Sequence, residues 1–357
     1  MKNGLKLAGL VAFAAAVPAF AQVKINDSLT VTGWATGSYQ YTKVSGTPYT
    51  DSLNIDAAEL QVTATPAKKT TVVASVYYRP SAEGGVSPGG SEATLLDAYV
   101  TYAASDTINL TAGKFLSYLG YESFYNNQDN MITLANQQFL APIPGYHEGF
   151  KLDFTPDKTD TMGFSVTDSE YQKPGYNATE GDGEFKHNGG FEAYYTNTAI
   201  NNLQIWLGAG YETKTKPGVD TDGVQAEPLF NAKGVLINPD TQDGSSVGVY
   251  DGWLTYTLDK AGDQLVFEEI YKDGGYLNKG SNWLGYYLWN LPNTKIKTWF
   301  GVSGEDVSGG SKYTKYSVSP SYTFNSSLSF KLQYSYTKYT TPSFKSNFLG
   351  AQVVFQF

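Results

Sequence analysis

The residues from Leu29 to Tyr41 read LTVTGWATGSYQY. Apolar side chains on one parity alternate with polar or small ones on the other: Leu29, Val31, Ala35, Tyr39 and Tyr41 against Thr30, Thr32, Thr36, Ser38 and Gln40. Alternation with a period of two is typical of a β-strand whose two faces meet different surroundings. The stretch therefore predicts a strand with one apolar and one polar face.

The same alternation recurs to the end of the chain. It predicts sixteen strands, over 28–41, 55–65, 70–78, 94–102, 108–115, 148–154, 161–167, 191–195, 203–211, 249–258, 265–271, 283–289, 295–302, 313–324, 328–336 and 347–357. Single-chain bacterial membrane barrels have an even number of antiparallel strands of about this length. The expected fold class is all-β, a transmembrane antiparallel β-barrel of about sixteen strands.

Alternate connections are short and the others are long. The short ones are 66–69, 103–106, 156–159, 259–263, 291–293 and 325–327, and the long ones are 80–93, 117–146, 168–190 and 212–248. Outer-membrane barrels have this asymmetry, with short periplasmic turns and long extracellular loops. A soluble β-sandwich has no reason to keep every short turn at one end.

The composition narrows the function classes. The chain has no Cys, a single arginine (Arg79) and a formal charge of -9. These features exclude disulfide scaffolds and thiolate metal sites, and they oppose a nucleic-acid partner. Acidic loop clusters such as Asp182-Gly183-Glu184 lack the ligand spacing of a calcium loop. We therefore expect no cofactor and no metal.

The first segment, 1–21, is expected to be a cleaved secretory signal peptide. It has a basic start at Lys2 and Lys6, an apolar stretch from Leu7 to Val17, and small residues around a cleavage site after Ala21. The barrel is then expected over 22–357.

The chain ends on Phe348-Leu349-Gly350-Ala351-Gln352-Val353-Val354-Phe355-Gln356-Phe357. This ending resembles the terminal strands of bacterial outer-membrane proteins. The resemblance implies recognition by the barrel-assembly machinery through the terminal Phe357, and a surround of outer-membrane lipid and lipopolysaccharide.

A more specific resemblance lies between Leu95 and Gly149. Leu95-Leu96-Asp97-Ala98-Tyr99-Val100, Ala112-Gly113-Lys114-Phe115 and Leu119-Gly120-Tyr121-Glu122, with Asn126, Asn127 and Asn130, resemble the OmpL-like putative β-barrel porin family. In that family a strand of this kind leads to a Gly-Lys-Phe strand end and a long loop. The resemblance implies an outer-membrane porin.

Charged residues on the polar parity are expected to line the pore. The acidic set comes from early strands and the basic set from late ones: Glu59, Asp97, Asp153 and Glu192 against Lys295, Lys297, Lys315 and Lys331. Because strand order follows chain order around an up-and-down barrel, the sets should lie on opposite walls. We expect a transverse field and a weak preference for cations.

Four of the six Trp also fall on the polar parity: Trp34, Trp206, Trp253 and Trp299. One interpretation is that they pack against a loop folded into the barrel. The other is that they form flat platforms for sugar rings.

The loop Ser117–Tyr146 differs from the other long loops because it is rich in apolar residues. We expect it to fold into the lumen and set the pore width, with Tyr121, Glu122, Phe124 and Phe139 at the constriction. An extracellular cap, or contact with a neighbouring barrel in a homotrimer, is the alternative.

Two further features bear on alternatives. His147 and His187 could serve a barrel enzyme, with Ser165 and Asp168 as the nearest candidate partners. Glu268 and Glu269 are adjacent, so one should face lipid unless a β-bulge or an interfacial depth intervenes.

Together these patterns predict an outer-membrane porin for passive diffusion of small hydrophilic solutes, with no enzymatic activity. A substrate-selective sugar channel is the second hypothesis. A barrel enzyme or a soluble exported polysaccharide-binding β-protein is the third.

Overall fold

A computed structural model describes residues 23–78, 93–122, 125, 127–135, 143–168, 189–213, 229–230, 236–237, 246–258, 262–274 and 279–357. The predicted signal segment, His187 and the acidic cluster at Asp182 lie outside the described residues, as do Phe124 and Phe139. Within the described residues, no helix is long and apolar enough to cross a membrane.

The strands are β1 (Val23–Asn26), β2 (Leu29–Val44), β3 (Tyr49–Ala67), β4 (Thr70–Tyr78), β5 (Ala93–Ala103), β6 (Ile108–Leu116), β7 (Tyr146–Phe154), β8 (Asp160–Thr167), β9 (Gly190–Asn197), β10 (Leu203–Glu212), β11 (Leu229–Phe230), β12 (Leu236–Ile237), β13 (Val247–Thr257), β14 (Gln264–Gly274), β15 (Gly280–Asn290), β16 (Ile296–Val307), β17 (Lys312–Asn325), β18 (Leu328–Thr341) and β19 (Ser343–Gln356). Each of the sixteen predicted strands coincides with one of these.

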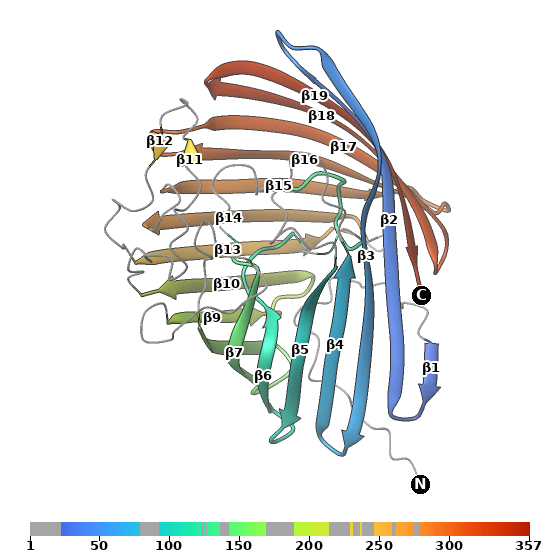
Figure 1. Cartoon of the computed structure of the whole chain (residues 1–357), viewed down its shortest axis with the longest axis vertical. Coiled ribbons are helices and arrows are strands. Elements are labelled where there is room, and N and C mark those ends of the chain that lie inside the picture. Colours follow the sequence, from blue (N-terminus) through green and yellow to red (C-terminus); the bar gives the residue numbers. More distant parts are fainter. Residues whose placement is uncertain are drawn as a thin grey trace.

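The sheet is a closed antiparallel barrel. Strands β2 to β10 and β13 to β19 pair in chain order, and β19 returns to pair with β2. At the seam, the N–H and C=O of Phe357 bond the C=O and N–H of Gly33 at 2.8 and 2.9 Å. Figure 1 shows the sheet curving around the segment that follows β6. The sequence prediction of an all-β barrel is confirmed.

The connections follow the predicted asymmetry. At one end the connections between strands are short, and the longest of those described in full have five residues, 155–159, 198–202 and 291–295. Left-handed backbone at Lys69, Asn202 and Asn293 closes three of these turns. The long connections, including 117–145 between β6 and β7, lie at the other end. At the same end, 45–48, 308–311 and 342 are short connections.

Burial divides each strand into two faces. On β13, Tyr250, Leu254 and Tyr256 are exposed, whereas Asp251 and Trp253 between them are buried. The apolar parity therefore points outward and the polar parity inward, as the alternation predicts. Buried polar residues of the other strands, such as Ser38, Ser165, Thr196 and Gln333, follow the same rule.

Two β-bulges change the predicted register. Between β4 and β5, Ser75 lies opposite both Leu96 and Asp97, because the pair Ala74–Ala98 is followed by Val76–Leu95. Alternation with Ala98, Val100 and Tyr102 would place Leu96 on the lipid face. Because of the bulge Leu96 is buried, and Leu95 is exposed in its place.

The second bulge lies in β3 and accompanies a longer hairpin. The pair Thr36–Ala57 is followed by Gly37–Ile55, so Asp56 is the extra residue. Strand β3 begins at Tyr49, where the sequence predicted a start at Ile55. Figure 1 shows the β2–β3 hairpin reaching beyond the neighbouring strands.

No bulge resolves the adjacent glutamates of β14. The strand pairs with β13 and β15 without a register shift, so Glu268 is buried inside and Glu269 is exposed outside. Glu269 lies opposite Trp283 of β15. Because Trp is enriched at membrane interfaces, this pairing favours an interfacial depth for Glu269.

Candidate pore constriction

The connection between β6 and β7, residues 117–145, is called the β6–β7 loop below. Its described part makes hydrogen bonds with inward-facing side chains of many strands. Its apolar side chains are buried among inward-facing aromatic residues: Tyr118 and Leu119 pack with Trp206 and Trp253, and Met131 and Ala135 pack with Tyr286 and Trp299. Burial of so many apolar side chains is favoured because it removes their surface from water.

Two glycines face each other in β6 and β7, three residue pairs before the loop begins. Gly113 of β6 has φ +127°, and a Cβ there would lie 2.2 Å from the carbonyl oxygen of Ala98. Its partner in β7 is Gly149. Neither position has room for a side chain, because a Cβ on Gly149 would lie 2.1 Å from the carbonyl oxygen of Val166.

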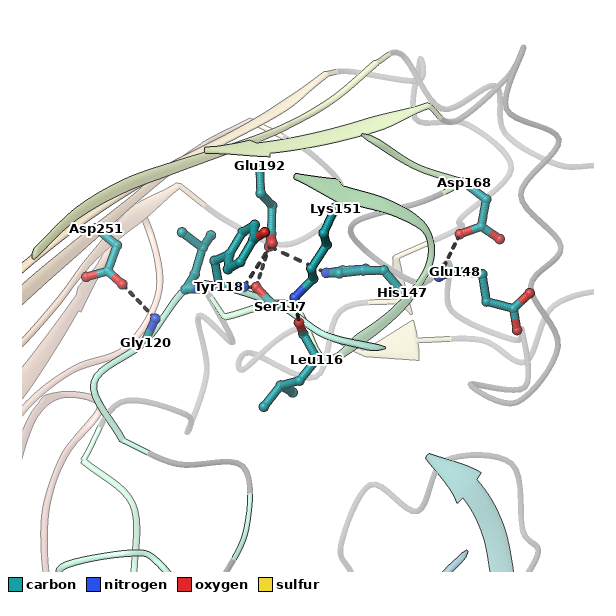
Figure 2. A network of polar contacts seen from close by, with 11 residues as sticks. Leu116, Ser117, Tyr118, Gly120, His147, Glu148, Lys151, Asp168, Glu192 and Asp251 are labelled. Atoms are coloured by element: carbon teal, nitrogen blue, oxygen red, sulfur yellow. Dashed lines mark hydrogen bonds and ion pairs between the residues drawn. The ribbon is translucent and has the colours of Figure 1, made fainter. Parts of the chain in front are cut away.

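Glu192 of β9 holds the start of the loop (Figure 2). Its carboxylate accepts the Ser117 hydroxyl through Oε1 and the Tyr118 N–H through Oε2, the latter at 2.9 Å. His147 Nε2 lies 3.5 Å from the same Oε1. All three side chains are buried, so the group forms a closed polar cluster.

Lys151 of β7 also contacts the start of the loop. Its Nζ donates a 2.5 Å hydrogen bond to the carbonyl oxygen of Leu116 and lies 4.0 Å from the ring centroid of Tyr118. The Tyr118 hydroxyl donates to Asp153 Oδ1 at 3.0 Å. Figure 2 shows Lys151 and Glu192 meeting the loop from the same side.

The backbone N–H groups of Gly120 and Tyr121 bind carboxylates on strands farther around the barrel. Gly120 donates to Asp251 Oδ2 of β13 at 2.7 Å, and Tyr121 donates to Glu268 Oε1 of β14 at 2.5 Å. The Tyr121 ring stands edge-on to Trp253, with centroids 5.6 Å apart. Hydrogen bonds to a charged acceptor are about twice as strong as neutral ones.

Glu122 joins the two halves of the loop. Its Oε2 accepts the Ala135 N–H at 2.6 Å, and its Oε1 accepts the Tyr286 hydroxyl of β15 at 2.6 Å. A residue predicted at the constriction thus fixes the loop's own shape.

The second half of the loop presents carbonyl oxygens, and lysines bind them. Lys315 Nζ of β17 donates to the carbonyl oxygens of Thr133 and Leu134 at 3.1 and 2.9 Å. Lys331 Nζ of β18 donates to the Asp129 carbonyl oxygen at 2.5 Å. Gln333 Oε1 completes the set by accepting the N–H groups of Ile132 and Thr133 at 2.5 and 3.0 Å.

One loop residue reaches the opposite wall. The Tyr125 hydroxyl donates to Asp97 Oδ2 of β5 at 3.0 Å, and its ring lies 6.3 Å from that of Trp34 on β2. Around the barrel, β5 is seven strands from β14 in one direction and nine in the other. The chain between Tyr121 and Tyr125 spans at most ~14 Å. The loop therefore connects nearly opposite walls within four residues.

Some of the charged residues predicted to line the pore bind the backbone of the β6–β7 loop. Glu192, Asp251 and Glu268 accept backbone N–H groups, whereas Lys315 and Lys331 donate to backbone carbonyls. Asp251 and Glu268 were missed as candidates, because nothing local in the sequence marks an inward carboxylate as a loop partner. Lys295 and Lys297 are exposed near the short turn before β16, away from these contacts.

The four inward Trp are buried, and aromatic neighbours lie against them. Trp206 stacks on Trp253 at 5.7 Å with an interplanar angle of 4°, and on Tyr194 at 6.0 Å. Trp299 meets Tyr286 edge-on. Two of the four Trp also contact loop residues, Trp253 with Tyr121 and Trp34 with Tyr125.

The residues considered for catalysis are differently placed. Ser165 is 0% exposed on β8, and Asp168 Oδ1 lies 3.4 Å from the backbone nitrogen of Glu148. His147 contacts Glu192, which holds the loop. The contacts assign His147 to the polar cluster at the start of the β6–β7 loop.

Comparisons with known proteins bear on the fold. No protein-family model matches the chain, and no curated protein is significantly similar to it. Among solved structures, OprB of Pseudomonas putida has a TM-score of 0.65 at 11% identity, covering 92% of this chain and 94% of that one. The fold is that of an outer-membrane porin.

Two other structures agree. OmpF of Salmonella typhi has a TM-score of 0.64 at 10% identity and covers 94% of this chain and 100% of its own. An anion-selective porin from Comamonas acidovorans has a TM-score of 0.60 at 10% identity, with 92% and 99% covered. At such identities the similarity establishes the shared fold.

Proposed function

We propose that the protein is a porin of the bacterial outer membrane through which small hydrophilic solutes diffuse passively. The β6–β7 loop lies inside the barrel in this proposal and sets the width of the pore. The observation that carries it is the binding of the loop by inward side chains from nearly opposite walls. Glu268 on β14 accepts the Tyr121 N–H, and Asp97 on β5 accepts the Tyr125 hydroxyl. Barrels of sixteen strands enclose an aqueous lumen that such a loop can narrow.

General diffusion is favoured over a sugar-selective channel. A sugar platform needs an open aromatic face, but Trp206 is 0% exposed and stacks between Tyr194 and Trp253. Trp34 and Trp299 are also buried, each 8% exposed. Tyr77 and Tyr125 lie against Trp34, and Tyr286 and Met131 pack with Trp299. An enzymatic role is not favoured either, because the buried Ser165 offers no accessible nucleophile.

Several associated features belong to the same proposal. They are removal of a signal peptide over 1–21, recognition of Phe357 by the barrel-assembly machinery, and contact with outer-membrane lipid and lipopolysaccharide. Membership of the OmpL-like family and assembly as a homotrimer also belong here. Cross-linking of the protein in native membranes measures the last of these.

The direct test is reconstitution of the purified protein in a planar lipid bilayer and in liposomes. We expect stepwise ohmic conductance in KCl, and liposome swelling rates that fall smoothly as the sugar becomes larger. Swelling that depends on the stereochemistry of sugars of equal size would favour the sugar channel. A folded protein with no conductance would contradict the proposal.

A further inference from the structure

Two inward carboxylates on the wall formed by β2 to β5 are arranged differently from those that bind the loop backbone. Glu59 of β3 and Asp97 of β5 flank β4, and Ser75 of β4 donates its hydroxyl to Asp97 Oδ2 at 2.9 Å. They are 8% and 5% exposed. We call them the Glu59–Asp97 dyad.

One carboxylate oxygen of the dyad has no hydrogen-bond donor. Glu59 Oε2 accepts the indole N–H of Trp34 at 2.7 Å, whereas Glu59 Oε1 is buried and has no hydrogen-bond partner. In the part of the chain that the structure describes, no lysine forms an ion pair with either carboxylate. A buried carboxylate is normally paired with a cation or fully hydrogen-bonded, and among the described residues Glu59 Oε1 has neither kind of partner.

Aromatic rings surround the same place. The Trp34 ring is edge-on to Tyr77 at 6.0 Å and to Tyr125 at 6.3 Å. Tyr146 packs against the same cluster. Ring faces carry negative electrostatic potential and attract a cation within about 6 Å of the centroid. Carboxylates and ring faces therefore favour the same kind of ligand.

We propose that the Glu59–Asp97 dyad, with the rings of Trp34, Tyr77 and Tyr125, binds the alkylammonium or guanidinium group of a solute in the pore. The N–H donors of such a group satisfy Glu59 Oε1, and its charge is stabilised by both carboxylates and by the rings. This inference rests on the proposed channel function. It goes beyond that function by naming a class of solute that is retained during passage.

Tyr125 links the site to the β6–β7 loop. Its hydroxyl donates to Asp97, and it also contacts the hydroxyl of Tyr146. Tyr125 belongs to the β6–β7 loop, so binding at the dyad is coupled to the position of that loop.

The test is block of potassium current through single channels by butylammonium chloride at neutral pH. We expect a concentration-dependent reduction of current, with an apparent dissociation constant that rises at least about tenfold in the Glu59→Gln, Asp97→Asn double variant. Glu305→Gln is the matched control. Glu305 is also a buried inward carboxylate and accepts Asn282 Nδ2 at 2.9 Å, away from the dyad.

A second variant separates the rings from the charges. Trp34→Leu keeps both carboxylates, so we expect a weakening of block by about three- to tenfold with an unchanged K⁺/Cl⁻ reversal potential. Glu59→Gln alone carries the charge test if the double variant does not fold, because Gln retains an acceptor for the Trp34 N–H.

The outcomes distinguish this inference from the function on which it rests. Absence of any KCl conductance in the folded wild-type protein would contradict the channel itself. Normal conductance without block by butylammonium would overturn the binding site alone. Equal block in the wild type and in the dyad variants would do the same.

Discussion

The backbone N–H of Gly120 and the carboxylate of Asp251 are joined by a 2.7 Å hydrogen bond across 131 positions of sequence. This contact is one of a series in which acidic side chains hold the first half of the β6–β7 loop. Lysines hold its second half, as Lys315 does at Leu134. Carboxylates thus accept hydrogen bonds from backbone N–H groups of the loop, and lysines donate hydrogen bonds to its carbonyl oxygens.

The first prediction concerns the Asp251 anchor. Asp251→Ala removes a charge-assisted hydrogen bond worth ~1.5–3 kcal/mol to the loop. We expect noisier single-channel currents and higher mean conductance, with an unchanged strand content in circular dichroism. Thr255→Ala, an inward residue on the same strand, should leave the current unaltered. Identical current traces for the two variants would refute a role for Asp251 in positioning the loop.

The second prediction tests the two faces of the barrel. Leu207 and Val353 are 54% and 46% exposed on the outer face. Lysine at either position should destabilise the folded barrel by ~2–4 kcal/mol near the membrane midplane. Lysine at the inward Thr63 should cost less than about 1 kcal/mol. Urea titrations in lipid vesicles measure both, and equal losses would contradict the assignment of faces.

Gln352 is a poor inward control for that experiment. The sequence places it on the polar parity, which is correct, but its Nε2 donates to Asp56 Oδ2 at 2.9 Å. Asp56 is the extra residue of the β3 bulge. Replacing Gln352 would therefore remove a contact between β19 and this bulge.

The third prediction concerns closure of the barrel at Gly33. A Cβ at this position would lie 2.7 Å from Cζ of the Phe357 ring and 3.1 Å from the carbonyl oxygen of Glu59. We expect Gly33→Ala to destabilise the barrel by about 1–3 kcal/mol. Its folded, fast-migrating band on unheated gels should then be lost at a lower temperature. Gly145→Ala is the control, since a Cβ there meets nothing within 4 Å. Equal melting of the two variants would be inconsistent with tight packing at the seam.

The fourth prediction concerns ion selectivity. Lys315 and Lys331 donate hydrogen bonds to carbonyl oxygens of the loop. The Glu59–Asp97 dyad has no ion-pair partner among the described residues. We expect a weak preference for K⁺ over Cl⁻ in a salt gradient. Neutralising both carboxylates of the dyad should move the reversal potential toward zero. A reversal potential that does not move would show that the dyad leaves the permeating ions unaffected.

The sequence was sufficient for the strands but not for their details. Alternation marks a strand because each face meets one kind of surroundings, and it located all sixteen. The bulge at Leu96 and Asp97 leaves no local signal in the sequence. Leu95 and Leu96 are both apolar, so either could occupy the outer face. The start of β3 at Tyr49 was missed because Thr50 to Asn54 resembles a polar loop.

The candidate site was predictable in outline only. The apolar content of 117–146 indicated that this loop needs burial, and Tyr121, Glu122 and Glu192 were recognised as candidates. The partners of the loop could not be predicted, because Glu268 and Gln333 bind backbone atoms more than 140 positions away. Such contacts depend on the register of the whole barrel.

The central claim is that the β6–β7 loop sets the width of the pore. The most direct measurement is the single-channel conductance of a variant lacking 124–139, checked for folding by its migration on unheated gels. This deletion removes the contacts of Tyr125, Asp129 and Thr133 with the walls and leaves the barrel strands intact. We predict a clear increase in conductance over the wild type. Wild-type conductance in the folded deletion variant would contradict the claim.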